Sequence, residues 1–87
     1  MNFGTVSSFW EAYGSLQRPA RECARKAYRL WRDNAFDPSL HFKCINQRER
    51  VWSLRITRGY RALCLFDGGD VTWFWIGSHE DYDRFFG

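Results

Sequence analysis

The stretch VWSLRITRGYRALCLF, residues 51–66, decides the fold predicted for this chain. Its first half alternates apolar with polar side chains, which predicts a half-buried strand over residues 51–57 with Leu54 inside and Arg55 outside. Arg58-Gly59 predicts a tight turn. The second strand, residues 60–66, then places Arg61 on the face opposite to Ala62 and Cys64. Two arginines are therefore predicted inside neighbouring strands, where a guanidinium must stay hydrated or paired.

Further strands are predicted on both sides of this pair. Asp67-Gly68-Gly69-Asp70 has the composition of a hairpin turn, and Val71–Ile76 follows it as the last strand. Leu40–Ile45 gives a weaker strand signal, and Met1–Ser7 is expected to hold a short first strand.

Two helices are predicted between the first strand and the others. One begins at Ser7 or Ser8, which is a suitable N-cap. The second covers about Arg18–Arg32 and follows a turn at Gly14-Ser15. Its predicted buried face holds small and apolar residues at helical spacing: Ala20, Cys23, Ala24, Ala27, Leu30 and Trp31. Another face carries a row of arginines: Arg18, Arg21, Arg25, Arg29 and Arg32.

These elements predict an α+β fold, a helical hairpin packed on one face of an antiparallel sheet. The chain of 87 residues is interpreted as one domain, residues 1–87, because so few residues cannot build a second core. No signal peptide or membrane-spanning run is recognised, and a cytoplasmic location without membrane partners is expected. Cys23, Cys44 and Cys64 are expected to be buried free thiols.

Charge is distributed unevenly along the chain. Residues 1–66 hold 12 of the 13 Lys and Arg residues and 5 of the 10 Asp and Glu residues, and the acidic excess lies in residues 67–87. Eleven of the 13 basic residues are arginines, which suit bidentate contacts to phosphate or carboxylate. The basic part predicts a nucleic acid or an acidic protein as partner, whereas the acidic end is unfavourable for approaching RNA.

Four residues supply an inventory for metal-free RNA cleavage: Arg55, Arg61, His79 and Tyr82. His79 or Tyr82 can transfer protons, and the arginines can neutralise a phosphorane. Lys43 and His41, before the central strands, are outside candidates. Structural alternatives stay open, since His79 can cap a turn and Tyr82 can pack.

Arg55 can instead form a salt bridge with Asp81 or Asp83. A metal site, a phosphate-binding glycine loop and a nucleophilic triad are disfavoured, because each lacks its partner residues. No cofactor is therefore expected.

The order of several motifs resembles the RelE/ParE superfamily of type II toxin–antitoxin toxins. The resemblance covers roughly residues 5–86, and it is strongest for the branch that ends in Trp-Ile-Gly-x-His-x-x-Tyr. It is carried by these segments: Phe9-Trp10, the Arg/Ala-rich helix, NAFDPSLHFK at 34–43, WSLRI at 52–56, YRAL at 60–63 and WFWIGSHEDYD at 73–83.

This resemblance implies a toxin neutralised by a cognate antitoxin that wraps it. In the ribonuclease branch it implies cleavage of mRNA in the ribosomal A site. By position, Arg55 and Arg61 resemble the phosphate-contacting arginines, Lys43 a further basic RNA-binding position, and His79 with Tyr82 the proton-transfer pair. The same scaffold also implies two alternatives: a ParE-type inhibitor of DNA gyrase without nuclease activity, or a degenerate toxin that acts mainly in an antitoxin–repressor complex.

Overall fold

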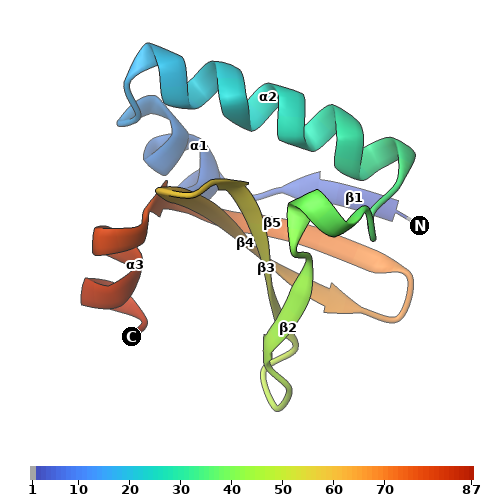
Figure 1. Cartoon of the computed structure of the whole chain (residues 1–87). Helices are drawn as coiled ribbons and strands as arrows, with labels where there is room; N and C mark the ends of the chain where they lie inside the picture. The colour runs from blue at the N-terminus through green and yellow to red at the C-terminus, as the bar shows by residue number, and fades with distance from the viewer. Residues whose placement is uncertain (1) are drawn as a thin grey trace.

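One five-stranded sheet runs through the molecule, covered on one face by two helices (Figure 1). The structure is a computed structural model, and it describes residues 2–87. Met1, which belongs to the predicted first strand, lies outside the described residues. The elements in chain order are β1 (Asn2–Thr5), α1 (Ser7–Gly14), α2 (Arg18–Asp33), the 3-10 turn η1 (Pro38–Leu40), β2 (Lys43–Asn46), β3 (Val51–Thr57), β4 (Tyr60–Asp67), β5 (Asp70–Ser78) and α3 (His79–Phe85).

The sheet is mixed, with strand order β1-β5-β4-β3-β2. Strands β2 to β5 form the antiparallel meander that the sequence predicted. The first strand instead pairs in parallel with β5, from Asn2 opposite Asp70 to Thr5 opposite Trp73. A parallel pair needs a long crossover, and α1 and α2 lie within the long segment that separates β1 from β5. No pattern in the sequence indicates this parallel pairing, and the predicted sheet did not include it.

Trp31 of α2 occupies the centre of the core between the helices and the sheet. Only 1% of its surface is exposed, and its ring meets those of Phe42 and Trp73 at centroid distances of 5.8 and 5.1 Å. Small residues on the same helix face, Ala20, Ala24 and Ala27, are buried too. Because they are small, α2 can approach the strands closely. The predicted α+β layering is thus observed.

Two details of the predicted helices are wrong. Leu30, assigned to the buried face, is 38% exposed. The N-cap of α1 is Val6 rather than a serine, and it has no side-chain cap. The hydroxyl of Ser8 instead donates to the Phe74 carbonyl at 2.8 Å, which ties α1 to β5.

The predicted strand over residues 40–45 starts later than expected. Asp37 accepts hydrogen bonds from the Ser39 amide and hydroxyl at 2.9 and 2.7 Å, which closes a 3-10 turn through Leu40. These bonds hold the pKa of the Asp37 carboxyl below its ordinary value. His41 then adopts a left-handed conformation (φ 46°), so extended pairing begins only at Lys43.

The three cysteines differ in burial, which corrects the expectation of three buried thiols. Cys64 is fully buried, and desolvation raises the pKa of its thiol to about 12. Cys23 is half-buried and Cys44 is exposed, because Cys44 lies on the edge strand β2. Over residues 2–87, no helix is both long enough and apolar enough to cross a membrane.

The C-terminal helix α3 lies on the side of the sheet away from α2 (Figure 1). The Trp75 ring meets Phe86 at a centroid distance of 5.3 Å and lies over Gly77. A Cβ atom on Gly77 would stand 2.5 Å from the Trp75 ring. Glycine is therefore required at this position by close packing and not by its backbone angles.

We predict that Gly77→Ala lowers the free energy of unfolding by about 1–3 kcal/mol, the usual cost of overpacking. Urea denaturation measured by tryptophan fluorescence tests this. Gly69→Ala is the matched control, because nothing lies within 4 Å of its added carbon. Equal stability of the two variants would contradict the packing argument.

Candidate functional site

The outer face of the sheet places basic side chains side by side. Arg55 of β3 pairs across the strands with Arg61 of β4, and Arg61 pairs with Gly77 of β5. Lys43 of β2 is opposite Ser53, which lies on this same face. Like charges placed directly opposite each other destabilise a sheet. This row therefore forms a surface that an anion would stabilise.

A concavity of about 260 Å³ opens over this row. It is lined by four Lys or Arg side chains and two histidines, and no lining residue is acidic; the lining residues are His41, Lys43, Ser53, Arg55, Thr57, Arg58, Tyr60, Arg61 and His79. We call it the basic concavity. It gathers Lys43, Arg55, Arg61 and His79, four of the five predicted site residues, together with the outside candidate His41.

Arg55 contacts His41 across the concavity. Its Nη1 atom lies 3.2 Å from Nε2 of His41. This contact replaces the alternative salt bridge to Asp81 or Asp83. Asp81 pairs with Arg84 at 3.4 Å, and Asp83 pairs with His79 at 3.5 Å.

His79 is held at the rim by the hairpin between β3 and β4. Its backbone amide donates to the Gly59 carbonyl at 2.8 Å, so the first residue of α3 is tied to the turn that follows Arg58. Ser78 caps α3 by accepting from the Asp81 amide at 3.1 Å. The cap of this helix is thus Ser78 and not His79, and the imidazole of His79 lines the basic concavity.

Tyr82 lies next to the basic concavity and is not one of its lining residues. The Arg61 guanidinium sits over the Tyr82 ring, 4.4 Å from its centroid. His79 stacks on the same ring at a centroid distance of 6.2 Å and an interplanar angle of 19°. One aromatic ring therefore fixes the positions of a cation and an imidazole.

The acidic end of the chain does not face the basic concavity. Asp81 and Asp83 pair within α3, and Asp67 pairs with Arg50. The negative charge that was expected to repel RNA therefore lies beside the site and not in it, because none of these carboxylates lines the basic concavity.

Sequence reasoning missed Arg58, Tyr60 and Asp83. The sequence predicts Arg58 only as a turn residue. The turn between β3 and β4 lies at the end of the arginine pair on these strands, so a basic turn residue there is close to the pair. Asp83 is four residues after His79, the spacing that places two side chains on one side of a helix.

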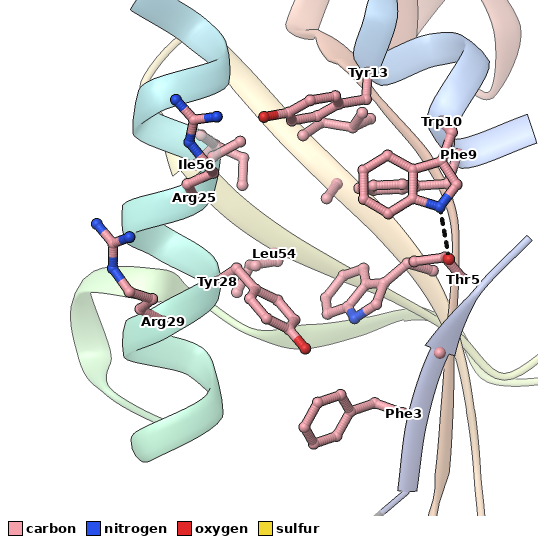
Figure 2. A pocket seen from close by; sticks show the side chains of 15 residues that line it. Phe3, Thr5, Phe9, Trp10, Tyr13, Arg25, Tyr28, Arg29, Leu54 and Ile56 are labelled. Atoms are coloured by element: carbon pink, nitrogen blue, oxygen red, sulfur yellow. Dashed lines mark hydrogen bonds between the residues drawn. The ribbon is translucent and has the colours of Figure 1, made fainter.

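A second concavity lies on the opposite face of the sheet, between α2, α1 and β1 (Figure 2). It has a volume of about 570 Å³ and a mostly apolar lining that includes Phe3, Phe9 and Ile56. Arg25 and Arg29 of α2 stand at its rim (Figure 2). Trp73 also lines it, and the Nε1 donor of this buried residue has no hydrogen-bond partner among residues 2–87. We call this second concavity the apolar groove.

Comparison with known proteins gives one family. The sequence pattern described as the ParE-like toxin domain matches residues 19–84. No curated protein sequence matches the chain.

Solved structures share the fold at low sequence identity. A YoeB/ParE toxin from Agrobacterium tumefaciens is 20% identical, with a TM-score of 0.69 over 91% of this chain and 99% of that one. A chain in the RelB–RelE antitoxin–toxin complex from Methanococcus jannaschii matches at 12% identity and a TM-score of 0.75, over 100% of this chain and 100% of that one. A copper-bound mutant toxin from Helicobacter pylori matches at 11% identity and a TM-score of 0.63, over 93% and 97%.

We predict that the basic concavity binds inorganic pyrophosphate, measured by isothermal titration calorimetry. Arg61→Ala is expected to raise the Kd about ten- to a hundredfold, because a charged hydrogen bond contributes about 1.5–3 kcal/mol. Arg48→Ala is the control, since Arg48 is exposed and lies outside the concavity. An equal effect of both substitutions would show that binding follows overall charge.

Proposed function

Because the chain belongs to the ParE-like toxin domain family, within the RelE/ParE superfamily of toxin–antitoxin toxins, we propose that it arrests growth by cleaving mRNA. The observation that carries this proposal is the basic concavity, in which arginines and a histidine converge with no carboxylate among the lining residues. A surface that only binds a protein has no need of a proton donor beside clustered cations.

The proposed roles follow from position. Arg55, Arg61 and Lys43 bind the phosphate and stabilise the negative charge that develops on it. His79 transfers a proton at the reacting oxygen. Tyr82 lies under Arg61 and against His79, so we assign it to positioning both groups rather than to proton transfer.

We predict that the chain arrests bacterial growth when it is expressed without an antitoxin, with rapid loss of mRNA. Arg61→Ala and His79→Gln are expected to abolish both effects. Loss of a charge-stabilising donor lowers rates about 10²–10³-fold, and loss of a general acid lowers them about 10²–10⁴-fold. Growth curves and northern blots are the measurements, and Arg48→Ala is the matched control.

Other outcomes of the same experiment would point elsewhere. Arrest with a DNA-damage response, unchanged by His79→Gln, would support gyrase inhibition instead. No arrest would contradict toxin activity and leave the repressor-complex alternative.

We also propose an antitoxin partner for this chain, since the RelE structure from Methanococcus jannaschii is one of a toxin with its RelB antitoxin. The apolar groove fits an amphipathic segment of such a partner. Apolar side chains of the segment would pack against Phe3, Phe9 and Ile56, and acidic ones would pair with Arg25 and Arg29.

We predict that the double variant Arg25→Glu with Arg29→Glu raises the Kd for the protein encoded beside this chain about tenfold or more. Two attractive ion pairs become repulsive, and exposed pairs contribute about 0.2–1 kcal/mol each. Biolayer interferometry is the measurement. Lys26→Glu is the control, because Lys26 is exposed on the same helix but does not line the groove. An effect no larger than that of the control would exclude the groove as the docking surface.

A further inference from the structure

We propose that His41 is a second catalytic residue of the basic concavity, the base that removes the proton from the attacking 2′-hydroxyl while His79 protonates the leaving oxygen. This inference rests on the proposed ribonuclease function. It goes beyond the His79 and Tyr82 pair, because it assigns the two proton transfers to histidines from two separate segments of the chain. His41 follows η1, whereas His79 begins α3, and both line the basic concavity.

The backbone around His41 fixes where its side chain starts. Asp37 caps the turn through Ser39, the Leu40 amide donates to the Asp37 carbonyl at 3.0 Å, and Leu40 is only 3% exposed. The chain then passes through the left-handed conformation at His41. A non-glycine residue in this conformation is uncommon and is held only when its surroundings determine it. The turn thereby points an exposed histidine into the concavity from an anchored segment.

The contact with Arg55 defines the chemical state of the His41 ring. A guanidinium has only donors, so the 3.2 Å contact is a hydrogen bond in the tautomer whose Nε2 accepts from Nη1. In that tautomer Nε2 is the unprotonated nitrogen, which is the form that a base requires. When a phosphate binds, Arg55 can donate to its oxygens and release Nε2 toward the adjacent hydroxyl.

His79 has the opposite partner. The Asp83 carboxylate lies 3.5 Å from Nε2 of His79, so it can pair with the protonated ring. The two imidazoles thus face different partners across one concavity, a cation for His41 and an anion for His79. The remaining titratable or charged groups around them are Lys43, Arg58, Tyr60, Arg61 and Tyr82.

The resulting step balances. Nε2 of His41 takes the proton of the 2′-hydroxyl, and the 2′-oxygen forms a bond to phosphorus. The bond from phosphorus to the 5′-oxygen breaks, and that oxygen receives the proton from the His79 imidazolium. The products are a 2′,3′-cyclic phosphate and a free 5′-hydroxyl, with one proton moved from His79 to His41 overall.

The test measures cleavage of an RNA by the purified full chain, with the RNA supplied free and on programmed ribosomes. We expect His41→Asn to lower the rate about 10²–10⁴-fold, because asparagine accepts the left-handed backbone but cannot act as a base. Binding of the matching 2′-deoxy oligonucleotide, which cannot be cleaved, should change by less than about threefold if the role is proton transfer and not affinity.

The pH profile separates the two histidines. Wild-type kcat/KM should be bell-shaped, because His41 must be unprotonated and His79 protonated. His41→Asn should lose the limb that rises on the acidic side, and His79→Gln the limb that falls on the alkaline side. Neither change is expected from a purely structural role.

A modified substrate separates the role of the acid, His79, from the role of the base, His41. Sulfur in place of the bridging 5′-oxygen at the cleaved bond makes a leaving group that needs no proton. This substrate should restore most of the activity of His79→Gln and none of that of His41→Asn.

Failure of this assignment differs from failure of the proposed function. If wild type cleaves RNA and His41→Asn cleaves it within about twofold of that rate, His41 is not the base and the nuclease proposal stands. Recovery of His41→Asn on the sulfur substrate would likewise overturn the assignment. If wild type cleaves neither free nor ribosome-bound RNA, the nuclease proposal fails, and this assignment fails with it.

Discussion

The cross-strand pair of Arg55 with Arg61 is the constraint on which the site depends. Antiparallel pairing of β3 with β4 places two positive charges directly opposite each other, an arrangement that costs stability. The buried residues on the other side of the same strands, Leu54 and Ala62, keep the register despite this cost. A one-residue slip would expose that apolar row and bury the arginines, so the core itself enforces the cationic row.

Successive side chains of β3 and β4 point to opposite faces of the sheet, and this alternation places the two concavities on different faces. Leu54 and Ala62 line the apolar groove, whereas Arg55 and Arg61 line the basic concavity on the other face. A partner segment seated in the apolar groove does not cover Arg55 and Arg61, which line the other face of the sheet. An antitoxin that used the groove alone would hold the toxin without blocking its concavity. Under the proposed function, complete neutralisation would require a second antitoxin segment that crosses the edge of the sheet, or a change of the sheet itself.

Local patterns predicted the antiparallel meander and the faces of its strands. Apolar and polar residues alternate with a period of two, and turn residues separate the runs, which together indicate neighbouring antiparallel strands. The parallel pairing of β1 was not predictable, since it depends on where a long crossover returns. The late start of β2 was not predictable from the hydrophobic pattern of residues 40–45. That pattern does not report the Asp37 cap or the left-handed backbone at His41, which together delay the strand. The convergence of Lys43, Arg55, Arg61 and His79 was predicted only in part, because the tie from His79 to Gly59 joins distant residues that no spacing relates.

The acidic end of the chain shows why the charge of a segment is a poor guide to the charge of a site. Exposed charges act over a Debye length of about 8–10 Å at physiological salt, so nearby groups dominate. Asp81 pairs with Arg84 within α3, and the Asp83 carboxylate lies against the imidazole of His79. The Asp83 carboxylate, which counts against RNA in the charge of the segment, therefore lies beside the proposed proton donor, 3.5 Å from Nε2 of His79. The same charge opposes RNA in a sum over residues, yet in the folded chain it lies on α3 and outside the lining of the basic concavity.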